Sequence, residues 1–394
     1  MQGQSSQMWF LIYKEEVRDW LDEPLATNYK SVIDGLENRC QIQILWQGAV
    51  KEYKLKIMSK LHTFQHSSEF ILESGDSFNS ISITYHTYGT LTSSSKVIWV
   101  CHALTANSDV ADWWNGLFGK GDLFDREEYF VVCANVLGSC YGTTGPLSEE
   151  LSEEQRFLHF PLVTTRDMAK AHILLKNALG IDQIHLLIGS SLGGQQAQEF
   201  AYTLKDKLTK LVLIATNAKH SPYGVAFNES QRLTLLADPT FEENRIDGGQ
   251  KGLKAARSIA MLSYRSYDGY LQTQSETELD KVSDFKASSY QNYQGQKLVN
   301  RFNAYSYWFL SKAMDSHNMG RGRNSIEKAL NEITADTLVV GITSDLLFPV
   351  SEQAFLAEHI SDGKLEVIDS IFGHDGFLVE TKTLEKTLIN FLNK

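Results

Sequence analysis

The sequence predicts an α/β protein with a mostly parallel, doubly wound sheet, and two observations lead to that prediction. Short apolar runs recur along the chain without the polar–apolar alternation of a half-exposed strand. Continuous apolar runs suit strands that are covered on both faces, as in a parallel sheet packed between helices. Helix-like stretches lie between several of these runs, and strand–helix alternation is typical of this fold class.

The expected elements follow in chain order. The first are a strand at 40–46 and an antiparallel hairpin formed by 68–72 with 80–88. The buried strands are expected at 97–101, 129–136, 184–188, 211–215, 337–342 and 365–368. The helices between them are expected at 165–179, 193–204 and 350–359.

The length of 394 residues suits two or three domains, or one large α/β domain with an insertion. Residues 218–330 interrupt the strand–helix pattern with helix-like pieces at 229–236, 252–263 and 300–315. We therefore expect a core at 58–217 and 331–394, with a helical lid inserted at 218–330. Residues 1–57 are expected to be an N-terminal extension that the core does not need.

The composition excludes several classes of protein. Hydrophobic residues make up 42% and charged residues 22%, as in ordinary globular proteins. The net charge of −11 argues against nucleic acid or an anionic membrane as partner. We see neither a transmembrane run nor a signal segment. The cysteines, at 40, 101, 133 and 140, lack metal-ligand spacing, so we expect reduced thiols in a cytoplasmic protein without a metal site.

A sharp turn that exposes a serine is predicted directly after the strand at 184–188. The residues GSSLG at 189–193 match the pattern G-x-S-x-G, and a helix-forming stretch follows them. In a strand–turn–helix setting this pattern is the nucleophile elbow, whose central serine, here Ser191, has a strained backbone. Glycine is needed at 189 and 193 because side chains there would collide across the turn. The elbow thereby narrows the predicted fold from the α/β class in general to the α/β-hydrolase fold.

An acid and a histidine follow Ser191 in the order that this fold requires. Asp345 comes after the strand at 337–342, and His374 comes after the strand at 365–368. His374 would take the proton of Ser191, and Asp345 would hold the imidazole in the required tautomer. Asp336 and Asp375 are the nearby alternatives for the acid.

Acyl transfer also needs donors for an oxyanion. One is expected to be the backbone N–H of Leu192, the residue after the nucleophile. The other is expected from the loop after the strand at 97–101, where we assign the N–H of Leu104. His102 in the same loop is expected to be a structural residue and not a second base.

Segments over most of the chain resemble one enzyme family. They are HALTANS at 102–108, NVLGSCYGTTGP at 135–146, GSSLGGQQAQEFA at 189–201, FNESQR at 227–232, SYQNYQGQKLVNRFNAYSYWFLSKAMDSH at 289–317 and FGHDGFL at 372–378. In the same order along the chain, they are similar to segments of the homoserine O-acyltransferases of the α/β-hydrolase superfamily. The resemblance runs from about residue 62 to the C-terminus and leaves residues 1–57 outside.

This resemblance implies an acyltransferase of methionine biosynthesis that moves an acyl group, usually acetyl, from coenzyme A to L-homoserine. Acyl-CoA is then a co-substrate, and no permanently bound cofactor is expected. The resemblance also implies a homodimer formed through the lid. It identifies Ser191, Asp345 and His374 as catalytic, and Arg232 and Asp375 as substrate-binding. A guanidinium can hold the carboxylate of a zwitterion, and a carboxylate can hold its ammonium.

Other functions stay open at this point. Leu192, Ser139 and residues 147–152 depart from the family's usual pattern, which leaves succinyl-CoA as donor and serine as acceptor as alternatives. An esterase-type hydrolase would use the same triad without an acceptor site. A catalytically inactive scaffold is disfavoured because the three catalytic residue types are all present. Without the resemblance, Arg232 would be read as a solvent-facing helix residue and Asp375 as a helix N-cap.

Overall fold

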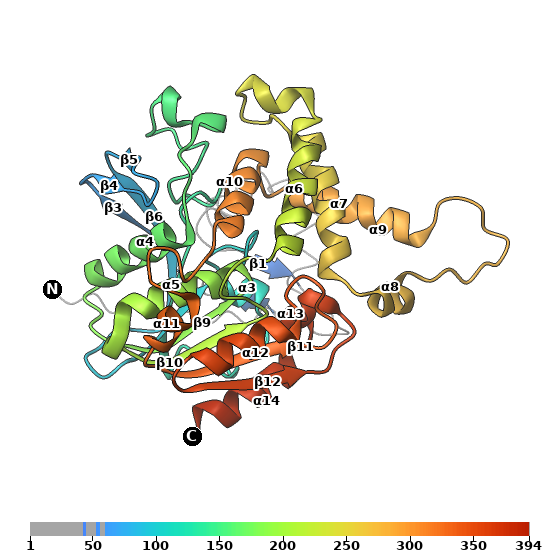
Figure 1. Cartoon of the computed structure of the whole chain (residues 1–394). Helices are drawn as coiled ribbons and strands as arrows, with labels where there is room; N and C mark the ends of the chain where they lie inside the picture. Colours follow the sequence, from blue (N-terminus) through green and yellow to red (C-terminus); the bar gives the residue numbers. More distant parts are fainter. Residues whose placement is uncertain (1–41, 45–52, 56–59, 394) are drawn as a thin grey trace, which may run out of the picture. The chain divides into compact units, whose positions relative to one another are not determined.

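The computed structural model describes residues 42–44, 53–55 and 60–393 (Figure 1). The chain divides into two compact units, residues 1–60 and 61–394. In the first unit, β1 (Ile42–Ile44) pairs antiparallel with β2 (Tyr53–Leu55). The strand predicted at 40–46 corresponds to β1, and the other residues of that prediction lie outside the described part of the chain.

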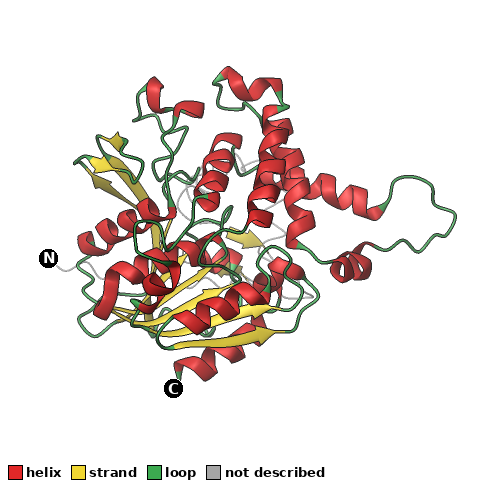
Figure 2. Ribbon diagram, in the orientation of Figure 1, coloured by secondary structure: helices red, strands yellow, loops and turns green. Residues whose placement is uncertain are grey.

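The second unit contains a sheet that has eight strands in the described part of the chain, in the order β12-β11-β10-β9-β7-β8-β6-β3 (Figure 2). Neighbours from β12 to β8 run parallel, and β6 pairs antiparallel with β8. The strands are β3 (Lys60–His66), β6 (Ile81–Tyr88), β7 (Lys96–Cys101), β8 (Tyr129–Ala134), β9 (Ile184–Ser190), β10 (Leu208–Ile214), β11 (Asp336–Ile342) and β12 (Gly363–Ile368). The predicted mostly parallel sheet is confirmed.

Two details of the strand predictions are wrong. The segment at 68–72 does not form a hairpin with 80–88, because β4 (Phe70–Ile71) pairs instead with β5 (Ser77–Phe78), and β6 joins the main sheet. A tight turn brings β4 and β5 together locally, so β6 is left to pair with β8. In addition, β12 is not buried on both faces: it is the edge strand, and the side chains from Lys364 to Val367 are largely exposed.

Successive residues of each strand point into two different hydrophobic layers, because side chains alternate across a sheet. In β7, Val97 and Trp99 face one layer, and Ile98 and Val100 face the other. The first layer is closed by α4 (Thr165–Ala178), α5 (Leu192–Leu204) and α12 (Val350–His359). The second is closed by α3 (Val110–Trp113), α13 (Gly376–Val379) and α14 (Thr381–Leu392).

A helical segment is inserted between β10 and β11. Its helices are α6 (Pro222–Leu236), α7 (Gln250–Tyr264), α8 (Tyr267–Gln274), α9 (Lys286–Val299) and α10 (Ala304–Asp315). The chain enters and leaves it at one neck, where the N–H of His220 donates to His317 O at 3.0 Å and that of Met319 to Ala218 O at 2.9 Å. We call residues 220–317 the inserted segment.

The inserted segment is shorter than the lid expected at 218–330. The difference lies in α11 (Ile326–Asn331), which packs against α5 and α12 and so belongs to the layers around the sheet. Within the segment, α8 and α9 occupy a polar, tyrosine-rich stretch in which no helix was predicted. The hydroxyl of Ser266 caps α8 by accepting the N–H of Gly269, a local signal that the apolar pattern did not carry.

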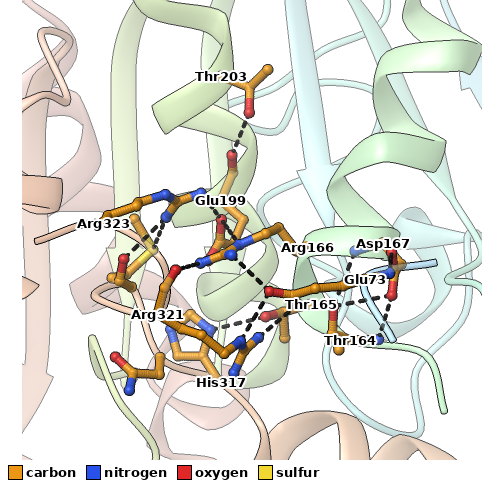
Figure 3. A network of polar contacts seen from close by, with 12 residues as sticks. Glu73, Thr164, Thr165, Arg166, Asp167, Glu199, Thr203, His317, Arg321 and Arg323 are labelled. Carbon is orange, nitrogen blue, oxygen red and sulfur yellow. Dashed lines mark hydrogen bonds and ion pairs between the residues drawn. The ribbon is translucent and has the colours of Figure 1, made fainter. Parts of the chain in front are cut away.

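A network of charges holds the chain where it leaves the inserted segment (Figure 3). Glu73, from the loop between β4 and β5, accepts from Arg166 of α4 at 2.6 Å and from Arg321 at 2.7 Å. Glu199 of α5 is buried and binds Arg323 at 2.5 Å and Arg166 at 3.3 Å. Residues 321–323 are thereby tied to α4, to α5 and to the β4–β5 hairpin. No helix of the described residues is long and apolar enough to cross a membrane.

Candidate active site

Ser191 occupies the turn between β9 and α5 and has a strained backbone, with φ 55° and ψ −126°. A non-glycine residue in such a region costs on the order of 1–3 kcal/mol. The turn is held by four hydrogen bonds: Ser191 N–H donates to Ile214 O at 3.0 Å, and Ser191 O accepts from Gly194 N–H at 2.9 Å, from Gln195 N–H at 3.2 Å and from the Thr216 hydroxyl at 2.9 Å. The predicted nucleophile elbow is therefore present in the backbone.

The two glycines of the turn are needed for the reason that the pattern predicted. A Cβ atom at Gly189 would lie 2.2 Å from the carbonyl oxygen of Gly193. A Cβ atom at Gly193 would lie 2.0 Å from the carbonyl oxygen of Cys101. Both separations are far below contact distance, and both partners are backbone atoms that cannot swing away. The elbow thus packs directly on the end of β7.

His374 and Asp345 form a buried pair. His374 Nδ1 lies 2.7 Å from Asp345 Oδ2, and Asp345 Oδ1 accepts the N–H groups of Leu347 and Phe348, each at 2.9 Å. The ring of Phe348 stacks on the imidazole with centroids 5.1 Å apart, and the Tyr264 ring lies at 5.6 Å. The carboxylate is therefore fixed in orientation, and the imidazole is enclosed by aromatic rings.

The electrostatics of this pair favour a basic imidazole. Burial disfavours the imidazolium, but the charge and hydrogen bond of Asp345 act in the opposite direction, and Asp375 adds to them. The net result is that the pKa of His374 is raised above its ordinary value of 6.5. A base that gains its proton readily is what nucleophile activation requires.

The topology brings Ser191 to the same edge of the sheet as this pair. Ser191 follows β9, Asp345 follows β11 and His374 follows β12, and these strands are parallel. Parallel strands place their carboxyl ends at one edge, which is where ligands bind in open α/β sheets. Of the three acids considered, Asp345 is the one bonded to His374: Asp336 lies at the opposite end of β11 and pairs with Lys210 and Lys364.

The two predicted oxyanion donors are buried and uncommitted. The side chains of Leu104 and Leu192 are packed in the core, and Leu192 is the first residue of α5. Among the described residues, neither backbone N–H donates to a protein acceptor. Buried N–H groups without a partner are rare in native structures, so both are available to a bound ligand.

His102 is a structural residue in this structure. Its Nδ1 lies 2.8 Å from Ala103 O, and its Nε2 lies 3.1 Å from the N–H of Val136. Burial lowers the pKa of His102 to about 4, so the ring is neutral and ties the loop after β7 to the loop after β8.

The helix pattern alone would indicate that Arg232 faces solvent, but in the structure its side chain is buried. Its side chain is 4% exposed, and its guanidinium donates to Glu229 at 2.8 and 2.6 Å, to Ser311 at 3.1 Å and to Asp315 at 2.6 Å. These bonds use four of the five N–H groups of an arginine. Arg232 therefore joins α6 to α10 and keeps one N–H for a ligand.

Asp375 is the residue before α13 but does not cap it with its side chain. Its Oδ2 lies 3.0 Å from Nε of Arg265, the residue that follows α7. Sequence reasoning missed Arg265 and its neighbour Tyr264, because both lie in the polar, tyrosine-rich stretch that matched no motif. It also missed Phe348, which no local pattern distinguishes from a core residue. In the described residues, no group of His, Cys, Asp and Glu side chains is arranged to hold a metal ion.

The fold and this site define an α/β-hydrolase-fold protein with a serine elbow and a buried histidine–aspartate pair. The family model for the alpha/beta hydrolase fold matches residues 96–381. The chain is 47% identical over 322 residues to a homoserine O-acetyltransferase of Cyclobacterium marinum, covering 81% of this chain and 92% of that protein. The chain belongs to the homoserine O-acetyltransferase family, and it is an acyltransferase.

Solved structures agree with this assignment. A homoserine O-acetyltransferase from Bacillus anthracis superposes with a TM-score of 0.77 at 25% identity, covering 85% of this chain and 98% of that one. The esterase E22 superposes with a TM-score of 0.76 at 19% identity over 85% of this chain and 100% of that one. At that identity the likeness to the esterase is one of fold alone. The family resemblance inferred from the motifs is thereby confirmed.

Proposed function

We propose that the protein transfers an acetyl group from acetyl-CoA to the hydroxyl of L-homoserine, as a step of methionine biosynthesis. The observation that carries this proposal is the buried His374–Asp345 pair at 2.7 Å, at the same sheet edge as Ser191. The relatives named homoserine O-acetyltransferase support the choice of acetyl as the group and homoserine as the acceptor.

In the proposed mechanism, the two half-reactions use one base. The Ser191 hydroxyl attacks the thioester carbonyl while His374 takes its proton, and the oxyanion accepts the N–H groups of Leu104 and Leu192. The carbon–sulfur bond then breaks, and the coenzyme A thiol leaves with the proton from His374. The acceptor hydroxyl attacks the acyl-serine while His374 takes its proton, and Ser191 regains that proton as the ester product leaves.

The acceptor is proposed to bind through its two charges. Asp375 lies next to His374 in the chain and is partly exposed, so its carboxylate can hold the ammonium of homoserine. The one uncommitted N–H of Arg232 is proposed to bind the carboxylate, as the resemblance implies. No permanently bound cofactor is required, because the acyl donor is consumed in each turnover. The described cysteines, Cys101, Cys133 and Cys140, are free thiols, which suits the proposed cytoplasmic location.

The inserted segment is proposed to form the interface of a homodimer. The loop between α8 and α9 stands away from the sheet in Figure 1, and Leu279 and Val282 within it are 100% and 89% exposed. Leu262 and Leu271 of the same segment are also exposed. A projecting segment with several exposed apolar side chains suits an association surface. Light scattering should give twice the chain mass for the wild type, and a monomer mass for the double variant Leu279→Ser, Val282→Ser would support this interface.

The function is tested by measuring free thiol release from acetyl-CoA and succinyl-CoA with L-homoserine or L-serine as acceptor. We expect sustained release with acetyl-CoA and homoserine, and none above background with Ser191→Ala. Release that needs succinyl-CoA or serine would replace one substrate and leave the mechanism standing. Sustained release without any acceptor would identify a thioester hydrolase and overturn the proposal. A mass increase of one acetyl group on the wild-type chain, absent in Ser191→Ala, tests the covalent step.

A further inference from the structure

Arg265 provides a second cation at the proposed acceptor site. It follows α7 directly, and its Nε lies 3.0 Å from Asp375 Oδ2, one residue from the catalytic histidine. The Arg265 side chain is 23% exposed, and its guanidinium carbon lies 5.9 Å from the centre of the Phe372 ring. Among the described residues, its two terminal nitrogens make no hydrogen bond to a protein acceptor. The four N–H groups of these nitrogens remain for a ligand, and one from each nitrogen can form a parallel pair.

The backbone fixes Arg265 in this place. The hydroxyl of Ser266 donates to the carbonyl oxygen of Ile371, in the loop that carries His374. Gly373 has φ 65°, and a Cβ atom there would lie 2.9 Å from both the carbonyl carbon of Arg265 and the nitrogen of Ser266. The inserted segment thus packs closely on the histidine loop at this point. Arg265 is held against the site and is not a freely moving surface arginine.

Arg232, the substrate-binding arginine implied by the family resemblance, cannot bind a carboxylate bidentately by itself. Arg232 has four N–H groups committed to Glu229, Ser311 and Asp315, so it can offer one N–H. Bidentate binding of a carboxylate needs two parallel N–H groups. In an α-amino acid, the ammonium and the carboxylate are bonded to the same carbon, so their binding groups must be neighbours. Asp375 and Arg265 are such neighbours.

We propose that Arg265 is an acceptor-recognition residue, which supplies the two parallel N–H groups for the α-carboxylate of the acceptor in addition to the single N–H of Arg232, while Asp375 binds its α-ammonium. The Arg265–Asp375 ion pair is then the charge complement of a zwitterion. An acceptor that lacks either charge leaves one member of the pair without its ligand. This inference depends on the proposed function, because it assumes that the acceptor is an α-amino acid with a side-chain hydroxyl.

The test compares two acceptors, L-homoserine and L-homoserine amide, in the wild type, Arg265→Gln and Arg265→Lys. The amide keeps the hydroxyl and the ammonium but lacks the carboxylate charge. A hydrogen bond to a charged group corresponds to roughly a 10- to 100-fold change in binding, so we expect Arg265→Gln to raise KM for homoserine by about that factor. KM for the amide and for acetyl-CoA should stay nearly unchanged, and Arg265→Lys should recover part of the loss.

The matched control is Arg245→Gln, which removes one positive charge from the same inserted segment at an exposed ion pair with Glu243 and Asp247. This variant should keep the wild-type preference for homoserine over the amide. Equal losses of Arg265→Gln on both acceptors, or a lost burst of thiol from acetyl-CoA, would overturn the inference, because Arg265 would then only hold the segment in place. A wild type that forms acetyl-enzyme but never acetylates homoserine would overturn the proposed acceptor, and this inference with it.

Discussion

Replacing Asp345 by Asn should disable the base while leaving the fold intact. In the wild type, Asp345 Oδ1 accepts two backbone N–H groups at 2.9 Å, and Oδ2 faces His374 Nδ1 at 2.7 Å. The oxygen of the asparagine amide must keep the two N–H groups, since an NH₂ group cannot accept them. The NH₂ group therefore faces Nδ1, which must become an acceptor. The ring proton then moves to Nε2, the nitrogen that has to take the proton of Ser191.

The expected loss follows from what the tautomer change removes. General base catalysis contributes roughly 10²- to 10⁴-fold, and the carboxylate that stabilises the imidazolium is removed as well. We expect kcat to fall by about 10³- to 10⁴-fold, which corresponds to roughly 4–5 kcal/mol of transition-state stabilisation. The pKa of His374 should also fall, because burial still disfavours the imidazolium and the opposing charge is gone.

The assay is thiol release from acetyl-CoA with saturating homoserine, with thermal melting as the check on folding. Asp336→Asn is the matched control, because Asp336 begins β11, the strand that Asp345 follows, and pairs with Lys210 and Lys364 at the end of β11 that is far from the site. Its kcat should stay within about twofold of the wild type. If a folded Asp345→Asn enzyme kept more than about a tenth of the wild-type kcat, the tautomer reasoning would be refuted. A comparable loss in Asp336→Asn would refute it too.

Three further predictions concern pH and stability. Because His374 must be neutral to act as base and its pKa is raised, kcat/KM should fall with decreasing pH along a limb centred above pH 6.5; a limb below that value would contradict the charge assignment. Burial raises the pKa of Glu352 from 4.5 to about 7; the hydrogen bond from Asn217 opposes this shift, and the charge of Asp345 adds to it. The ionised Glu352 carboxylate therefore destabilises the folded state fully above pH 7 and not at all below pH 4.5. Glu352→Gln should therefore raise the unfolding free energy by about 1 kcal/mol at pH 8, after allowance for solvent screening, and not at pH 4, as measured by urea titration. Glu199→Gln should lower the unfolding free energy by roughly 2–4 kcal/mol because it breaks a buried charge network. Glu332→Gln, which removes an exposed ion pair with Lys205, should lower it by less than about 1 kcal/mol. Equal losses for the two variants in denaturant titration would show that burial of the charge does not set the effect.

Much of the fold followed from patterns that are local in the chain. The strands β7, β9, β10 and β11 lie within a few residues of their predicted positions, since an unbroken apolar run has few alternatives to a buried strand. The helix α12 has the predicted bounds. Patterns that are weak locally led to errors: β12 is apolar enough to resemble a central strand, but its place at the edge of the sheet depends on the order of all the others. The helices α8 and α9 were missed because their exposed surfaces carry no clear apolar stripe.

The sequence by itself determined the elbow at Ser191, the order of Ser191, Asp345 and His374 along the chain, and the family. The elbow depends on backbone sterics over a few residues, and the order of the site residues and the family depend on motifs that follow one another along the chain. Only the tertiary structure decided which charges meet: His374 with Asp345, Arg232 with Asp315, and Arg265 with Asp375. The members of the first and the last pair are 29 and 110 residues apart, and each ends up beside its partner only after the segments between them have folded. The sequence gives the charge of each side chain, but the packing of the folded chain determines which opposite charge lies beside it.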